Sequence, residues 1–154
     1  MKKLLWLQTL VLLAGSIFAW YTVYMDFVRF YGMYQSLTRI QNCVIPNPMT
    51  TPCFYGAFAF VGAFIWAAII QKLPRTKQVI QQSRLVLLLI GSTIFAWSNL
   101  GVEIYNFYFK AQGDKISCSG VATDNIFTTP CFIGSVIFLT ALVISLIIKK
   151  KNCK

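Results

Sequence analysis

Four long apolar runs, separated by polar segments, set the pattern of the chain. They cover residues 4–24, 54–70, 85–102 and 132–148, and none of them contains a charged residue. A helix of that length can cross a hydrocarbon core of ~30 Å. Backbone polar groups in lipid need internal partners, which separate spans obtain as helices. The pattern therefore predicts an all-α membrane protein with four transmembrane helices, in one integral membrane domain covering residues 1–154.

Composition and charge add an orientation to this picture. Hydrophobic residues make up 57% of the chain and charged residues 12%, which excludes an ordinary soluble domain. Ten of the 14 basic residues, and no acidic residue, lie before the first run, between the second and third, or after the fourth. Positive loops stay in the cytoplasm, so we expect both termini there. We therefore interpret the net charge of +10 as an orientation signal, and we expect the protein in a bacterial cytoplasmic (inner) membrane. We expect no nucleic acid partner.

The second half of the chain repeats motifs of the first half at a nearly constant offset. TTPCF occurs at 50–54 and 128–132, and GSIFAW at 15–20 matches GSTIFAW at 91–97. The same alignment pairs Asp26 with Glu103. We therefore predict a duplicated two-helix hairpin, a parallel internal repeat with repeat 1 at about 4–72 and repeat 2 at about 84–149. Because the N-terminal run recurs inside the chain, we expect a retained anchor and not a cleaved signal.

Each TTPCF copy stands directly before an apolar run and reads as a helix start. Thr51 and Thr129 are expected to cap backbone N–H groups, and the prolines that follow them suit the first helical position. Gly56 and Gly134 are expected to let a neighbouring helix approach closely. These features predict that the second helix of each hairpin begins at TTPCF.

An aromatic stripe extends the first helix beyond its apolar run. Its members recur at helical spacing: Trp20, Tyr24, Phe27, Tyr31 and Tyr34. We interpret the stripe as packing or as an interfacial belt. The alternative is a groove for a lipid tail or a quinone ring.

Two acidic residues occupy equivalent positions in the two repeats. Asp26 and Glu103 lie just beyond the apolar runs, and Arg29 follows Asp26 within ion-pairing reach. The pattern favours a polar contact near the symmetry axis. A role in proton handling or ligand binding is the alternative.

The cysteines predict an oxidising compartment. Cys43, Cys53, Cys118 and Cys131 all fall on the outer side of the predicted topology, whereas Cys153 lies in the cytoplasmic tail. An even number of outer cysteines indicates two disulfides. The repeat favours Cys43–Cys53 and Cys118–Cys131, but pairing across the repeats is also compatible with the symmetry.

Four transmembrane helices with two outer cysteine pairs resemble, in layout, the bacterial disulfide-bond-formation membrane proteins and the vitamin K epoxide reductases. The resemblance implies a bundle that passes electrons between loop cysteines and a quinone bound near the outer membrane face. That superfamily carries a C-x-x-C motif at a helix start, and this chain has none. We therefore assign no catalytic residue. If the protein is redox-active, Cys53 and Cys131 are the first candidates for reactive cysteines, followed by Cys43 and Cys118.

The residue content excludes several functions. The chain contains no histidine, which rules out histidine-ligated haem, the usual zinc catalysis and a Ser-His-Asp triad. We expect no metal and no cofactor, and a non-enzymatic bundle with disulfide-tied outer loops. Its partners would be the lipid bilayer and a membrane protein or a second copy. The alternative is a membrane thiol–disulfide oxidoreductase coupled to a quinone.

Overall fold

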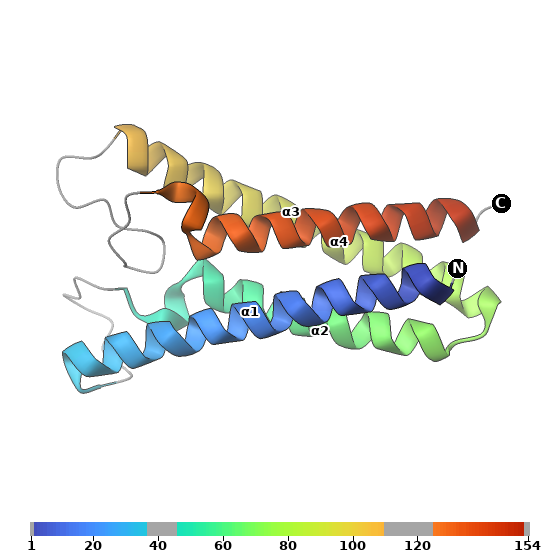
Figure 1. Ribbon diagram of the computed structural model, residues 1–154, viewed down its shortest axis with the longest axis horizontal. Helices are drawn as coiled ribbons and strands as arrows, with labels where there is room; N and C mark the ends of the chain where they lie inside the picture. The colour runs from blue at the N-terminus through green and yellow to red at the C-terminus, as the bar shows by residue number, and fades with distance from the viewer. Residues whose placement is uncertain (1, 37–45, 110–124, 153–154) are drawn as a thin grey trace.

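The protein is built from four long α-helices that run side by side (Figure 1). The computed structural model describes residues 2–36, 46–109 and 125–152. Within these ranges the elements are α1 Lys2–Tyr34, η1 Pro48–Thr50, α2 Pro52–Lys72, α3 Arg75–Phe109, η2 Ile126–Thr128 and α4 Pro130–Asn152. All four α-helices are long and apolar enough to cross a membrane. Within these ranges the predicted all-helical fold is confirmed, with four helices that could cross a membrane.

Two of the four helices are long and two are short. α1 has 33 residues and α3 has 35, whereas α2 has 21 and α4 has 23. At 1.5 Å per residue, α1 is about 50 Å long and α2 about 32 Å. As predicted, the first helix continues well past its apolar run, and the third helix does the same. α3 also starts well before its run, because the polar segment from Arg75 to Arg84 is rich in good helix formers such as Gln, Lys and Arg.

A short turn, Leu73–Pro74, joins α2 to α3. Leu73 is extended (φ −82°, ψ 152°), which is the conformation that a following proline favours. The Pro74 carbonyl accepts hydrogen bonds from the N–H groups of Lys77 and Gln78, at 3.0 Å each. Pro74 thus ends one helix and begins the next, and it makes α2 and α3 antiparallel neighbours.

The four helices form a closed ring. α1 packs against α2 and α4, and α3 packs against α4 and α2, while α2 and α4 also meet across the centre. Both termini and the α2–α3 turn lie at one end of the bundle, here called the termini end (Figure 1). At the other end, the loop end, α1 and α3 terminate and α2 and α4 begin.

Aromatic stacking fills the centre of the bundle. The rings of Phe60 on α2 and Phe138 on α4 stack with centroids 3.7 Å apart, and both side chains are 2% exposed. Leu12, Leu85 and Leu89 are fully buried and belong to the same core. The outward faces are also apolar, with large exposed side chains such as Trp6, Ile17 and Leu87. Helices that are apolar on all faces are typical of a membrane interior.

A polar cluster joins three helices in the half of the bundle nearer the termini. The Gln82 amide donates to the Gln8 carbonyl oxygen at 3.1 Å and to the Ser145 hydroxyl at 2.8 Å. The Gln8 amide donates to the same hydroxyl at 3.2 Å. All three side chains are at most 1% exposed. Interhelical hydrogen bonds of this kind hold membrane helices in register.

Candidate functional site: a cysteine pair at the loop end

Matching turns lead the chain into α2 and α4. The Asn47 side-chain oxygen accepts from the Met49 N–H at 2.9 Å, and that of Asn125 accepts from the Phe127 N–H at 3.0 Å. Each asparagine thereby starts a short 3-10 turn, η1 or η2. The two turns have the same length and the same caps, so they present α2 and α4 to the bundle in the same way.

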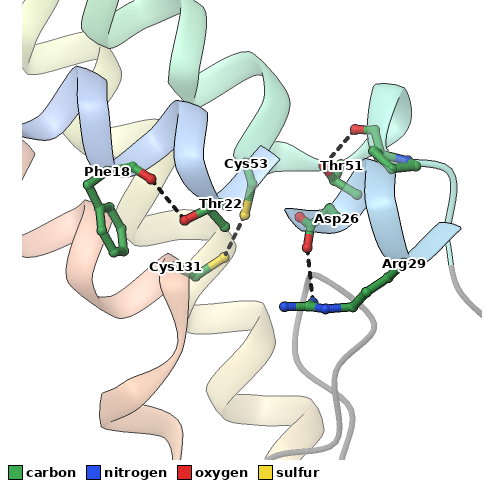
Figure 2. A network of polar contacts seen from close by, with 8 residues as sticks. Phe18, Thr22, Asp26, Arg29, Thr51, Cys53 and Cys131 are labelled. Carbon is green, nitrogen blue, oxygen red and sulfur yellow. Dashed lines mark hydrogen bonds and ion pairs between the residues drawn. The ribbon is translucent and has the colours of Figure 1, made fainter. Parts of the chain in front are cut away.

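The prediction that a threonine side chain caps each helix start is wrong for one of the two TTPCF copies. Thr51 occupies the N-cap position of α2, but its side chain makes no capping hydrogen bond. Its hydroxyl instead donates to the Pro48 carbonyl at 2.7 Å, because the preceding 3-10 turn places that acceptor next to it (Figure 2). The Thr129 hydroxyl donates to the Ile126 carbonyl at 2.8 Å and also accepts from the Phe132 N–H at 3.4 Å, a long capping bond. Both helices begin at the prolines, as predicted.

The structure brings two of the predicted site residues together. Cys53 and Cys131 are the second residues of α2 and α4, and their Sγ atoms lie 3.8 Å apart (Figure 2). A disulfide bond measures ~2.05 Å, so these two sulfurs are in contact but not bonded to each other. Cys43, Cys118 and Cys153 lie outside the described residues. The pairing of Cys43 with Cys53 and of Cys118 with Cys131 stays a prediction.

A small cavity of about 60 Å³ lies against the two cysteines, and the sequence repeat aligns most of its lining residues in pairs. The pairs from α1 and α3 are Phe18 with Phe95, Ala19 with Ala96, and Thr22 with Asn99. The pairs from α2 and α4 are Pro52 with Pro130, Cys53 with Cys131, Gly56 with Gly134, and Phe60 with Phe138. Ser135 is the one lining residue outside these pairs. The cavity therefore lies where equivalent positions of the two hairpins face each other.

The glycines of this cavity have a different role from the predicted one. A Cβ atom added at Gly56 or Gly134 would meet no atom within 4 Å, so no helix approaches closely there. These glycines leave space next to the cysteines. The close approach occurs at Gly15, where an added Cβ would lie 2.6 Å from the Phe60 ring.

The cavity wall is almost entirely apolar apart from the sulfurs. The Thr22 hydroxyl donates to the Phe18 carbonyl at 3.0 Å, and the Asn99 amide donates to the Phe95 carbonyl at 2.8 Å. The Ser135 hydroxyl donates to the Cys131 carbonyl at 2.7 Å. Each polar side chain is thus turned to its own helix. A water molecule needs roughly 10–15 Å³, and a cavity that binds benzene has about 150 Å³, so a quinone ring does not fit without movement of side chains.

Two carboxyl groups near the loop ends of α1 and α3 are buried. Asp26 is 4% exposed and Glu103 is 7% exposed. Asp26 Oδ1 pairs with Arg29 at 3.2 Å, which confirms the predicted ion pair. Asp26 Oδ2 is buried without a hydrogen-bond partner among the described residues. The sequence places these groups at the interface, but the structure buries them in the bundle.

The aromatic stripe packs beside this site and does not form part of it. Trp20 contacts Phe58 edge-on with ring centroids 5.3 Å apart, and Phe27 contacts Phe54 at 6.3 Å. The other exposed members of the stripe lie on the outer face of α1, where half or more of each side chain is accessible: Tyr24 and Tyr31. None of the five stripe residues lines the cavity. These contacts support the packing interpretation.

The contact between Cys53 and Cys131 was not predicted as such. The signal in the sequence is the motif TTPCF, which occurs twice and places both cysteines at the same position relative to a helix start. Within the described ranges, no group of three or more Cys, Asp and Glu residues could hold a metal ion.

No family model matches the chain, and no curated protein or solved structure is significantly similar to it.

Proposed function

We propose that the protein is a membrane thiol–disulfide oxidoreductase, in which Cys53 and Cys131 pass electrons between two cysteine pairs. The contact of 3.8 Å between their Sγ atoms carries this proposal. Exchange requires a thiolate to attack a disulfide sulfur through a mixed disulfide. Cys53 and Cys131 stand at the starts of α2 and α4, which meet across the centre of the ring, and their sulfurs already touch, so the attack needs little movement.

The exchange balances within the chain when the predicted Cys118–Cys131 disulfide is formed and the predicted Cys43–Cys53 disulfide has been reduced. The Cys53 thiolate attacks Sγ of Cys131, the Cys118–Cys131 bond breaks, and Cys118 leaves as a thiolate that takes up a proton. The Cys43 thiolate then attacks Cys53 and releases Cys131 as the second thiol. Two electrons have moved from the pair Cys43/Cys53 to the pair Cys118/Cys131. A substrate dithiol or disulfide outside the membrane would supply or remove these electrons.

A quinone is the less favoured electron acceptor. Reduction of a quinone to a quinol would take up the two electrons and two protons of one dithiol. The cavity of about 60 Å³ is smaller than a quinone ring requires. Coupling to a quinone would therefore need an opening of the helices at Phe18 and Phe95, which line the cavity.

The duplicated hairpin and its orientation belong to the same proposal. The aligned pairs of lining residues, together with the matched turns η1 and η2, support a parallel internal repeat. The basic residues at the termini end support a cytoplasmic position for that end. The cysteine pair would then face the oxidising side of a bacterial cytoplasmic membrane.

Disulfide mapping of cysteine variants tests the function. The double variant Cys43→Ser/Cys118→Ser has lost both thiols that could resolve the mixed disulfide, so we expect Cys53 linked to Cys131 after equilibration in a glutathione redox buffer. Each single variant keeps one resolving thiol, so less of this bond should accumulate there. Cys153→Ser is the control and should leave the wild-type pattern unchanged. A double variant in which Cys53 and Cys131 both stay thiols would contradict the relay.

A non-enzymatic bundle with disulfide-tied loops is the second candidate. The observation that favours it is the packing around the sulfurs, because Cys53 and Cys131 are half-buried and line the same cavity as the stacked rings of Phe60 and Phe138. Such a protein would present its loops to a membrane partner or a second copy. Bridges that resist mild reductant, never exchange partners and leave the absorbance of added quinone unchanged would support this candidate over the relay.

A further inference from the structure

A second cavity lies at the termini end of the bundle, away from the cysteine pair. It has a volume of about 290 Å³ and is lined by the start of α1, the end of α2 and the start of α3. Figure 1 shows the N-terminus and the α2–α3 turn together at this end. A cavity that binds benzene has about 150 Å³, and pockets for drug-sized ligands have roughly 300–1,000 Å³. The space therefore admits one compact group and not a whole large ligand.

Hydrogen bonds hold the walls of this cavity together. The Gln71 amide at the end of α2 donates to the Leu5 carbonyl of α1 at 3.2 Å, and it also donates to the Thr9 hydroxyl. Leu73, which follows α2, is extended ahead of Pro74 and lines the cavity. The Leu5 side chain is 8% exposed and belongs to the bundle core. The cavity is thus formed by packed helices that are tied to each other.

Two positive side chains line the cavity from different helices, Lys2 from α1 and Arg75 from α3. Both are exposed, and within the described part of the chain neither forms an ion pair with a carboxylate. The acidic residues of the chain stand far from them in the sequence, at positions 26, 103, 114 and 124. Like charges that share a cavity repel each other, and an anion between them replaces this repulsion with attraction. The cavity is therefore complementary to an anion.

The rest of the lining is suited to the boundary of a membrane. Leu5, Trp6 and Leu73 contribute apolar surface, and the Trp6 side chain is 62% exposed. Tryptophan is enriched where the headgroups of a bilayer meet its hydrocarbon core. The first apolar run begins at Leu4, directly after two lysines, so the polar boundary passes through the level of the cavity. A matching ligand carries a negative charge and continues into an apolar part.

We propose that this cavity binds the phosphate group of an anionic phospholipid. The Arg75 guanidinium can donate to two phosphate oxygens side by side, and the Lys2 ammonium adds a second positive charge. The Gln78 amide, which also lines the cavity, can donate to a further oxygen of the headgroup. Trp6 and Leu73 would contact the glycerol part, and the acyl chains would stay in the bilayer. Basic cavities between membrane helices bind anionic headgroups in this way.

The lipid site is independent of the proposed cysteine exchange, because the cysteine pair lies at the loop end. Its occupant would join the start of α1 to the start of α3, which approach this cavity from two sides. The paired cations and the apolar lining favour a lipid over a soluble phosphate compound, which would use the cations alone.

Native mass spectrometry of the full chain in detergent, with phosphatidylglycerol added, tests the site. The site variant is Lys2→Gln/Arg75→Gln. The control Lys3→Gln/Lys77→Gln removes the same charge from the same two helices, at exposed residues that do not line the cavity. Each cation near an anionic lipid contributes about a five-fold factor, so we expect the site variant to bind roughly 25-fold more weakly. The control should stay close to the wild type, and Lys2→Arg/Arg75→Lys should keep most of the affinity.

Two further probes identify the class of ligand. Phosphatidylcholine carries the phosphate without a net charge and should bind more weakly than phosphatidylglycerol. Glycerol phosphate lacks the acyl chains and should not displace the bound lipid at equal concentration. Displacement would indicate a site for a soluble phosphate compound and overturn the lipid assignment.

The remaining outcomes also contradict the lipid site. Equal losses in the site variant and in the control would mean a diffuse attraction of the basic surface. Unchanged binding in the site variant, or equal binding of the two lipids, would mean that the cations of the cavity do not hold the headgroup. A site variant that is less stable than the control without added lipid would mean that the two cations serve the packing. None of these results would affect the cysteine exchange.

Discussion

Phe60 and Phe138 stack face to face across the centre of the bundle, with ring centroids 3.7 Å apart and an interplanar angle of 12°. They occupy aligned positions of the sequence repeat and come from α2 and α4, the two helices that face each other across the ring. Gly15 on α1 gives the Phe60 ring the space it occupies. Both rings also line the cysteine cavity, so their packing affects both stability and the geometry of the site.

A methyl group at Gly15 should therefore destabilise the bundle. In Gly15→Ala the new Cβ would lie 2.6 Å from one Phe60 ring carbon and 2.9 Å from the Ile137 side chain, and the stacked Phe138 prevents the ring from moving away. Overpacking of this kind costs about 1–3 kcal/mol. Gly91→Ala is the matched control, because Gly91 is the sequence counterpart of Gly15 and has no atom within 4 Å of an added Cβ. Unfolding in mixed detergent micelles measures both, and equal stabilities would contradict the packing.

The polar cluster near the termini should contribute to stability through hydrogen bonds. Ser145→Ala removes the oxygen that accepts from both Gln8 and Gln82. Interhelical hydrogen bonds in membranes contribute about 0.6 kcal/mol on average and up to about 1.7 kcal/mol, so we expect a loss of about 1 kcal/mol. Thr140→Ala on the same helix is the control, because its exposed hydroxyl bonds only to the Val136 carbonyl. A double-mutant cycle with Gln82→Ala that gives no coupling energy would argue against the cluster.

Asn125 should stabilise the turn η2 that leads into α4. Its side-chain oxygen accepts from the Phe127 N–H and starts η2. Replacing a capping asparagine by alanine costs about 1 kcal/mol, whereas aspartate caps equally well. We expect Asn125→Ala to lower the unfolding midpoint and Asn125→Asp to leave it nearly unchanged. If both variants behave alike, the capping bond is not what stabilises the turn.

The two ends of the bundle should differ in their accessibility from outside the cell. A membrane-impermeant maleimide should label Cys153 only after the membrane is permeabilised, because the basic residues at the termini end are expected in the cytoplasm. Met49→Cys, at a side chain that is 47% exposed at the loop end, should be labelled in intact cells. Peptide mapping by mass spectrometry distinguishes the two sites. The reverse pattern would invert the topology.

The apolar runs were sufficient to predict the helices, because each run must satisfy its backbone within lipid. The extension of α1 was readable from the aromatic spacing between Trp20 and Tyr34. The start of α3 was harder to place, because the segment from Arg75 to Arg84 is polar and its helicity comes from residue propensity and from Pro74.

The sequence predicts only part of the candidate site. Cys53 and Cys131 were identified as candidates, but their mutual contact depends on which helices meet across the ring. Local patterns do not determine this. The role of Thr51 was mispredicted because a 3-10 turn precedes the helix and supplies a nearer acceptor, the Pro48 carbonyl. The burial of Asp26 and Glu103 was missed because charges near an interface usually reach water.

The unequal helix lengths have a consequence for access to the cysteines. α1 has 33 residues against 21 in α2, and α3 has 35 residues against 23 in α4. At 1.5 Å per residue, each long helix exceeds its short neighbour by about 18 Å. The surplus projects at the loop end (Figure 1). The sulfurs, at the starts of the two short helices, therefore lie below the loop-end tips of α1 and α3. We expect their rate of labelling to fall as the size of a thiol reagent increases.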